Sequence, residues 1–347
     1  MVPFVWSDDC LLHDPGGEVW VGVRTPATEV PERAVAIREA LRSAGAREVA
    51  ATRHDDDALL AVHDESLVAF LRSAWTEWAG AGLPSDRVVP YVFARPELTS
   101  GRPPALPAAV WARPGLFAYD TMTLIGPGTW EAARAAVDAA LTAVDVVAGG
   151  EAVAYACCRP PGHHVVRSAY GGSCYLNNAA VAAAELVRRL GGPVAVVDVD
   201  AHHGNGTQEL FLGRDDVRTA SVHVDPGAGW FPHFLGFASE NGAGNLNLPL
   251  APGTGDGGWL AAVRAATAFA AGARALVVAL GVDAAAGDPE SPLQVTAAGY
   301  REAGRVLGGL GLPTVVVQEG GYDLATIGGL VVETLAGIRH AHPRASR

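Results

Sequence analysis

The sequence contains no lysine, so its 25 basic residues are all arginine. The 37 acidic residues outnumber them and give a formal net charge of −12. A chain with this excess of negative charge and no basic stripe is a poor binder of the phosphate backbone of nucleic acids. We therefore expect no nucleic-acid partner, whereas the same charge favours small cationic substrates. Abundant alanine without lysine is typical of GC-rich bacterial genomes.

Cysteine is also scarce, with only Cys10, Cys157, Cys158 and Cys174 in the chain. These residues form no CxxC pair and no disulfide framework, which indicates reduced thiols in a cytoplasmic protein. The first residues, MVPFVWSDDC, lack the basic and apolar regions of a signal peptide. No apolar run has the length and purity of a membrane-spanning helix. The expected location is the cytoplasm, without a membrane partner.

Apolar residues make up 49% of the 347 residues, which is ample for a large core. Short apolar runs such as VAVVDVD, ALVVALGVD and TVVVQEGG alternate with helical patterns such as GTWEAARAAVDAALTAVDVVAGG. This alternation predicts an α/β fold: one domain over residues 1–347, with an open, mostly parallel sheet and helices on both faces. The stretch 85–123 is predicted to be a long ordered loop near the site, and residues 341–347 a loose tail.

Polar side chains gather where four of these predicted strands end. In open parallel sheets ligands bind outside the carboxyl ends of the strands, so we expect these side chains to meet in one pocket. A single aspartate there is usually a cap or loop residue, but four polar strand ends are harder to explain in that way. The residues are Asp198, Asp200 and His202, then Asp283, then Tyr322 in QEGGYD, and His163 with His164 in RPPGHH.

The first of these groups has the spacing of a metal site. Asp198, Asp200 and His202 are two residues apart and share one face of an extended chain. Carboxylate and imidazole ligands suit a borderline divalent metal, and three protein ligands with an open position indicate a catalytic site. Asp200, His202 and Asp283 would form such a set. The sequence has no nucleophile elbow, Walker loop or GxGxxG motif that would indicate a different chemistry.

The same residues carry a family resemblance. RPPGHH, DVDAHHGNGT, LGVDAAAGDP and EGGYD resemble the motifs of the arginase–deacetylase superfamily, in its branch of zinc-dependent histone deacetylases and acetylpolyamine amidohydrolases. The similarity runs in order from the segment after Pro31 to about Leu335. The stretches AYGGSCYLNNAAVAA and FPHFLGFA are most similar to bacterial acetylpolyamine amidohydrolases. The resemblance implies the arginase–deacetylase fold.

The resemblance also implies a role for each site residue. Asp200, His202 and Asp283 match the zinc ligands, with one zinc ion per chain. His163 and His164 match a tandem pair beside the metal-bound water, and Tyr322 matches the tyrosine that hydrogen-bonds the oxyanion. Asp198 and Asn205 match the partners of the two histidines. A structural potassium ion is a further expectation, with the candidate residues Asp198, Asp200, His202, Ser221 and Val222.

The substrate channel departs from the family pattern. Relatives grip the substrate stem between two aromatic walls, of which Phe231 matches one, whereas Ser173, after Gly172, stands where the other is expected. Either the channel has a gap there, or Trp111, Phe117 or Trp230 fills it. Glu290 is predicted to act as a rim carboxylate that selects a distant ammonium, with a solvated loop residue as the alternative.

Taken together, the residues predict a zinc amidohydrolase that deacetylates acetylpolyamines or similar small cationic acetamides. A protein lysine deacetylase or a deacetylase of specialised metabolites is the alternative within the family. A two-manganese ureohydrolase and a non-catalytic acylamine-binding protein are the alternatives outside it. Relatives often dimerise, so a homodimer is also considered. His54, His63, His203 and Cys174 are expected to be structural, and the roles of His223 and His233 are left open.

Overall fold

The computed structural model describes residues 1–343, and its centre is an eight-stranded sheet in which all neighbouring strands are parallel. The order across the sheet is β4-β1-β5-β10-β9-β6-β7-β8. The predicted α/β fold with a mostly parallel sheet is therefore confirmed. The strands are β1 (Phe4–Trp6), β4 (Glu48–Ala50), β5 (Val153–Ala156), β6 (Val194–Asp198), β7 (Val217–Val224), β8 (Asn245–Leu250), β9 (Ala275–Leu280) and β10 (Thr314–Gln318).

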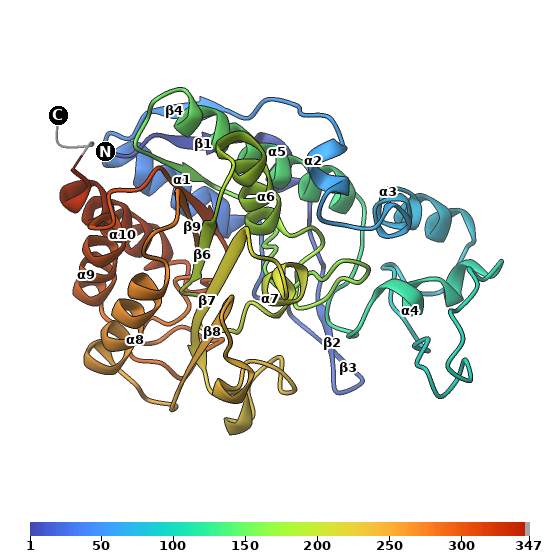
Figure 1. Ribbon diagram of the computed structural model, residues 1–347. Coiled ribbons are helices and arrows are strands. Elements are labelled where there is room, and N and C mark those ends of the chain that lie inside the picture. Colours follow the sequence, from blue (N-terminus) through green and yellow to red (C-terminus); the bar gives the residue numbers. More distant parts are fainter. Residues whose placement is uncertain (344–347) are drawn as a thin grey trace.

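Helices cover both faces of this sheet, as Figure 1 shows. On one face lie α1 (Glu32–Ser43), α8 (Asp256–Phe269), α9 (Ala297–Gly308) and α10 (Ile327–Ala341). On the other lie α5 (Thr129–Ala148), α6 (Asn178–Leu190) and α7 (Asn205–Phe211), whereas α3 (Glu65–Gly80) lies farther from the sheet, to the right in Figure 1. The shorter helices are α2 (Asp57–Leu60) and α4 (Pro114–Phe117), with 3-10 turns at Asp8–Leu11, Val110–Ala112, Pro226–Ala228 and Ala238–Glu240.

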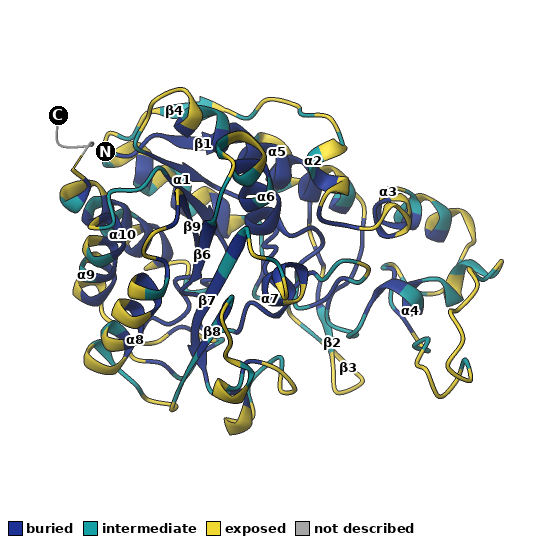
Figure 2. Cartoon of the chain, in the orientation of Figure 1, coloured by how far each residue is buried: buried dark blue, intermediate teal, exposed yellow. Residues whose placement is uncertain are grey.

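Strand β6 shows why the apolar runs are nearly continuous. Val194 and Val196 pack into the core beneath α5 and α6, whereas Ala195 and Val197 pack into the core beneath α8, α9 and α10. Successive side chains of a strand point to opposite faces, so a strand covered on both sides needs apolar residues at every position. Figure 2 shows β6 and β9 as buried throughout, with exposed positions on the outer sides of the helices.

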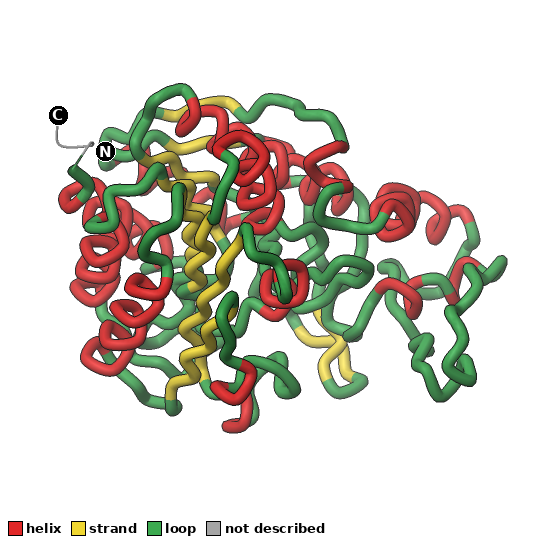
Figure 3. The backbone as a smooth tube through the Cα atoms, viewed as in Figure 1, coloured by secondary structure: helices red, strands yellow, loops and turns green. Residues whose placement is uncertain are grey.

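A hairpin and a long loop extend from the carboxyl ends of the strands, where Figure 3 shows mostly loop. An antiparallel hairpin is formed by β2 (Glu18–Trp20) and β3 (Val23–Thr25). The predicted long loop at 85–123 contains only a 3-10 turn and α4, and a bridge between Val88 and Ile125 joins its beginning to the segment that follows it. Both segments supply residues to the surface around the site.

The predicted loose tail begins too early in the chain. Ala341 is still part of α10, and the next residue, His342, is buried with its Nε2 atom 2.9 Å from the carbonyl oxygen of Leu312. The remainder of the predicted tail, 344–347, lies outside the described residues. Within residues 1–343, no helix combines the length and apolar character needed to cross a membrane.

Candidate active site

Four adjacent strands in the middle of the sheet deliver the predicted residues to one place. In the order β5-β10-β9-β6, each strand ends at the same edge of the sheet because all four are parallel. The segments that follow them carry His163 and His164 after β5, Tyr322 after β10, Asp283 after β9, and Asp200 with His202 after β6. The structure thus brings together the polar strand ends on which the sequence-based prediction rests.

Asp200, His202 and Asp283 form a compact group, with one ligand atom from each lying within 4.8 Å of the others. The Nδ1 atom of His202 is 3.0 Å from Asp283 Oδ2 and 3.3 Å from Asp200 Oδ1. Backbone N–H groups hold both carboxylates: Gly320 donates to Asp200 Oδ2 at 2.7 Å, and Ala201 donates to Asp283 Oδ1 at 2.8 Å.

A glycine is required at position 320. A Cβ atom there would lie 2.6 Å from a carboxylate oxygen of Asp200 and 2.6 Å from one of Asp283. Only a residue without a side chain therefore allows the backbone of the QEGGYD segment to approach both carboxylates. This explains in physical terms why the glycine comes between the end of β10 and Tyr322.

The chemistry of this group fits a divalent cation. Asp200 and Asp283 are both fully buried, and two buried negative charges so close together repel each other. Burial and, next, the charge of Asp200 raise the pKa of Asp283 to about 7. Two carboxylates and one imidazole are a donor set that zinc commonly takes, and its two positive charges would neutralise both acids.

The tandem histidines have different partners. The Nδ1 atom of His163 lies 2.9 Å from Asp198 Oδ2, and that of His164 lies 2.7 Å from Asn205 Oδ1. Both rings are buried, with centroids 4.0 Å apart. Burial opposes protonation of His163, but the charges of Asp200 and Asp198 raise its pKa to about 10. Burial and the neighbouring positive charge of His163 lower the pKa of His164 well below its usual range.

A buried carboxylate that we did not predict holds the histidine loop. Glu319 Oε2 accepts the backbone N–H of Gly162 at 2.6 Å and that of His163 at 3.1 Å. Burial raises the pKa of Glu319 to about 7. A glutamate between an apolar strand and a double glycine could have drawn attention, because charged residues are rarely buried without partners. Its group with Cys174 and His163, within 4.8 Å, is a second candidate metal cluster, but it uses one of the tandem histidines.

Tyr322 lies against a buried arginine. The guanidinium carbon of Arg33 is 4.6 Å from the centroid of the Tyr322 ring, and Arg33 donates to the carbonyl oxygens of Glu319 and Gly321 at 2.7 and 2.5 Å. Arg33 is paired in turn with the buried Glu29. Burial raises the pKa of Tyr322 well above its usual value, so its hydroxyl is protonated and able to donate a hydrogen bond.

A small cavity of about 70 Å³ connects these groups to the surface. It brings predicted substrate residues together with His164, His202 and Tyr322. The lining also includes three residues that we did not predict, because the hairpin, the segment after it and the long loop that carry them are placed by tertiary contacts. The predicted residues are Gly172, Ser173, Phe231 and Glu290, and the additional ones are Glu18, Thr28 and Met122.

Two of the predicted substrate residues lie away from this cavity. Phe117 is buried and stacks on Phe70 with centroids 4.5 Å apart, so its ring fills the core instead of the channel. Trp111 is 48% exposed on the long loop and does not line this cavity. Trp230 packs against the core beneath α8. None of the three aromatic residues lines this cavity, whereas Met122 does.

The remaining predicted residues lie around the site. Ser221 pairs with Asp198 across β6 and β7, and its Oγ atom is 2.8 Å from Nδ1 of the buried His223. Val222 follows on β7, so the residues predicted for a structural cation are neighbours, and that cation stays a prediction. His203 contacts Gln208 and Asn247 at 3.1 Å, away from the three candidate metal ligands.

The chain is similar in sequence to known deacetylases and amidohydrolases. Residues 27–338 match the family model described as a histone deacetylase domain. The acetylpolyamine amidohydrolase of Mycoplana ramosa is 39% identical over 96% of this chain and 98% of its own length. Acetylpolyamine amidohydrolase 1 of Pseudomonas aeruginosa is also 39% identical, over 97% of this chain and 99% of its own.

Solved structures show the same relationship in three dimensions. The crystal structure of an acetylpolyamine aminohydrolase from Burkholderia pseudomallei superposes with a TM-score of 0.91 and 35% identity, covering 98% of this chain and 99% of the other. The HD domain of HDA15 superposes with a TM-score of 0.75 and 27% identity, over 99% and 98% of the two chains. The sheet, the converging strand ends and these similarities together show that the chain belongs to the histone deacetylase family.

Proposed function

We propose that the protein is a zinc-dependent amidohydrolase that removes acetyl groups from small cationic amines, acetylpolyamines foremost. The observation that carries this proposal is the convergence of Asp200, His202 and Asp283 with two histidines and a tyrosine at one cavity. The names of the relatives support it, because both are acetylpolyamine amidohydrolases of nearly the same length.

Asp200, His202 and Asp283 would hold the zinc ion, which supplies polarisation of the amide carbonyl and acidification of a water molecule. His164 donates its Nδ1 proton to Asn205, so its Nε2 atom is free to accept a proton from that water and return it to the leaving amine. His163 is held by Asp198 at 2.9 Å, and a carboxylate partner favours the protonated ring, which would place positive charge beside the reacting group. Such acid–base work is typically worth roughly 10²–10⁴ in rate.

The Tyr322 hydroxyl donates a hydrogen bond to the oxygen on which negative charge develops. Arg33 orients Tyr322 by holding the backbone that precedes it, at Glu319 and Gly321, and by packing against its ring. Asp288 Oδ2 also accepts the Tyr322 backbone N–H at 2.7 Å. A preorganised donor of this kind contributes roughly 10²–10³ to the rate.

Two carboxylates at the cavity favour a cationic substrate. Glu290 Oε1 accepts a hydrogen bond from the Thr28 hydroxyl at 2.8 Å, and Glu18 lines the same cavity. Burial and, next, the charge of Glu290 raise the pKa of Glu18 to about 7. An ammonium group placed between the two acids would relieve this repulsion. The pair thus supports the role that we predicted for Glu290.

The decisive experiment is kinetics with a defined zinc content on acetylputrescine, acetylcadaverine, acetylspermidine and acetyl-lysine peptides. We expect the acetylpolyamines to be hydrolysed with the highest kcat/KM. A preference for the peptides would favour the protein deacetylase alternative, and absence of turnover on every acetylated amine would favour a non-catalytic binder. About one zinc ion per chain is expected, whereas two manganese ions would indicate a ureohydrolase.

A homodimer is a further proposal. The long loop carries Tyr91, Leu98 and Leu106, each more than 60% exposed, and exposed apolar residues of this kind suit a subunit interface. Sedimentation or light scattering on the purified protein would test it. A monomer at micromolar concentration would contradict this proposal without affecting the proposed reaction.

A further inference from the structure

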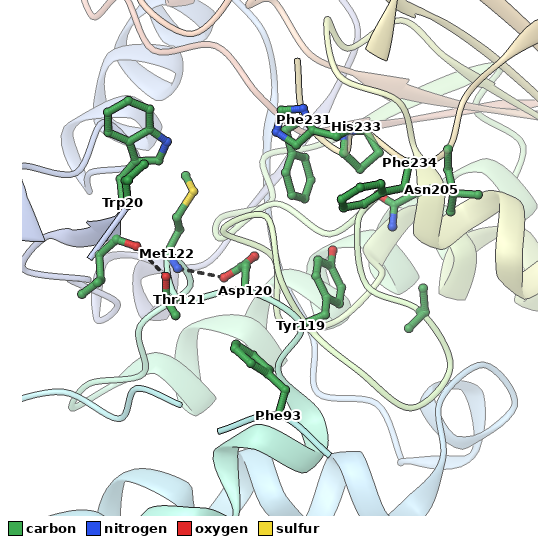
Figure 4. Close-up of a pocket in the computed structure, with 15 residues that line it drawn as sticks. Trp20, Phe93, Tyr119, Asp120, Thr121, Met122, Asn205, Phe231, His233 and Phe234 are labelled. Carbon is green, nitrogen blue, oxygen red and sulfur yellow. Dashed lines mark hydrogen bonds between the residues drawn. The ribbon is translucent and has the colours of Figure 1, made fainter. Parts of the chain in front are cut away.

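A larger hollow adjoins the reaction cavity and has a different character. Its volume is about 570 Å³, within the range of small-molecule sites, and its lining is mostly apolar. Figure 4 shows these side chains around the open space, with the Met122 side chain between those of Trp20 and Phe231. We call this space the apolar hollow. It is defined by Trp20, Val21, Phe93, Tyr119, Phe231 and Phe234.

Met122 belongs to both spaces, because it lines the apolar hollow and the reaction cavity. Its position is determined by its neighbour: Asp120 Oδ1 accepts the backbone N–H of Met122 and that of Thr123, both at 2.9 Å. Asp120 Oδ2 accepts the backbone N–H of Gly172 at 2.6 Å, and Thr123 Oγ1 accepts that of Ser173 at 2.8 Å. The turn that carries Met122 is therefore tied on both sides to the turn that carries Ser173.

The side chains of Met122 and Ser173, one on each turn, differ greatly in length. Ser173 is too short to form a wall between the reaction cavity and the hollow, so the thioether of Met122 is the partition on that side. Methionine has three rotatable bonds and adapts to irregular neighbours, whereas an aromatic ring would be a stiff wall. A partition of this kind allows a bulky substituent to pass from the cavity into the hollow.

The β2–β3 hairpin contributes to the walls of both the reaction cavity and the apolar hollow. Glu18 lines the reaction cavity, and the next residues, Val19 to Val21, line the hollow. The hydroxyl of Thr121 donates to the carbonyl oxygen of Val19 at 2.7 Å and so anchors the hairpin beside Met122. A carboxylate that suits an ammonium group and an apolar surface thus follow each other along one strand.

The hollow lies on the outer side of the cavity. Trp20 is 61% exposed and Phe234 is 86% exposed, whereas the proposed metal ligands Asp200 and Asp283 are buried. A substrate with its acetyl group at the buried end therefore has its amine side directed towards the hollow. Large exposed apolar side chains around a concave space are typical of a binding site.

We infer that the hollow binds an apolar aryl or alkyl group on the amine side of the acetylated substrate, and that Met122 is the residue that determines this specificity. This inference rests on the proposed deacetylation and extends its substrate class from plain acetylpolyamines to acetylated diamines with an apolar substituent. The carboxylates Glu18 and Glu290 would hold the cationic nitrogen while the substituent lies in the hollow.

The test compares two substrates that carry the same charge. N-acetylputrescine and N-acetyl-N′-benzylputrescine both have one ammonium group, and only the second has an apolar arm. For the zinc-loaded wild type we expect kcat/KM to be at least about tenfold higher for the benzyl compound, since discrimination by apolar burial is commonly of this size. Trp20→Ser, which removes hollow surface, and Met122→Phe, which stiffens the partition, should bring that ratio close to one.

A matched control is Leu212→Ser, which removes an apolar side chain of similar exposure, 66%, from outside both the hollow and the long loop. It should keep the wild-type ratio. A wild-type ratio near one, with acetylputrescine still hydrolysed, would overturn the inference and leave the proposed function intact. The inference would also fail if the wild-type ratio was near one and Trp20→Ser turned a dimer into a monomer. A second copy of the chain, and not the substrate, would then cover the hollow.

A measurement independent of turnover separates this inference from the proposed function. Calorimetry on the zinc-loaded protein can compare the binding of N-benzylputrescine with that of putrescine. Binding at least about tenfold tighter for the benzyl compound, lost in Trp20→Ser, supports the hollow as an apolar site. Equal affinities would overturn it. If neither acetylated compound is hydrolysed, the proposed function fails, and this comparison still decides whether the hollow binds an apolar arm.

Discussion

Asp198 and His163 are 35 positions apart in the chain, yet Asp198 Oδ2 lies 2.9 Å from the Nδ1 atom of His163. Asn205 has the same relation to His164, at 2.7 Å. One histidine thus has a charged partner and the other a neutral one. A carboxylate stabilises the protonated ring much more than an amide does, so two adjacent imidazoles receive different proton affinities.

The first prediction exchanges the neutral partner for a charged one. Asn205→Asp places a carboxylate beside His164 Nδ1, which stabilises the protonated ring and raises the pKa of His164. His164 must be unprotonated to accept a proton, so the rise of kcat/KM with pH should move to higher pH by about one unit or more. Activity near neutral pH should fall, with recovery on the alkaline side. An acidic limb at the wild-type pH would contradict the proposed role of His164.

The second prediction concerns the hydroxyl of Tyr322. Tyr322→Phe should lower kcat by roughly 10²–10³ while the zinc content and the unfolding transition stay as in the wild type, because only the hydrogen bond to the oxyanion is removed. Tyr170→Phe is the matched control, since the buried Tyr170 hydroxyl has no hydrogen-bond partner among the described residues. If both variants lose activity equally, or if Tyr322→Phe retains near-wild-type turnover, the proposed donor role is wrong.

The convergence of the proposed metal ligands and the histidine pair could be predicted from the sequence because of where the strands end. Apolar runs such as VAVVDVD identify a strand buried on both faces, and parallel strands carry their following residues to one edge. The shorter strands β1 and β4, with three residues each, and the edge strand β8, which contains Asn and Pro, lack that signal and were not predicted. Their absence from the prediction did not matter for the site, because they lie outside the four central strands.

The wall of the channel could not be predicted in the same way. Met122 and Glu18 reach the cavity only because Asp120 binds the backbone of Gly172 and Thr121 binds that of Val19. Such contacts between irregular segments leave no periodic pattern in the sequence. The aromatic residues on the same long loop therefore did not indicate which side chain lines the channel, and Phe117 belongs to the core.

The third prediction tests the two rim carboxylates. Glu290→Gln and Glu18→Gln should each lower kcat/KM for acetylputrescine by about tenfold, the usual value of one hydrogen bond to a charged group. Hydrolysis of the neutral analogue N-butylacetamide should be unchanged or faster, since the substituted side chains repel it less. Glu97→Gln, on an exposed part of the long loop, serves as the control. Equal losses on the charged and the neutral substrate would show that the carboxylates do not select the cation.

The last prediction is the pH dependence of stability due to His63, which is buried away from the metal ligands. Its Nδ1 atom lies 3.1 Å from the carbonyl oxygen of Val166, and its Nε2 atom accepts the backbone N–H of Asn177 at 2.9 Å. Both nitrogens are thus committed to the neutral ring. Burial lowers the pKa of His63 from 6.5 to about 4.

Between pH 6.5 and 4 the unfolded chain therefore binds a proton at position 63 that the folded chain does not, so stability falls as the pH is lowered through this range. In urea unfolding at a series of pH values, His63→Gln should reduce the slope of unfolding free energy against pH by up to about 1.4 kcal/mol per pH unit. Loss of the buried hydrogen bonds should also cost about 1–3 kcal/mol at pH 7.5. Above pH 7 the slopes of the two proteins should agree, because His63 is neutral in both states. Parallel curves from pH 7.5 down to pH 4.5 would mean that His63 takes up its proton without unfolding.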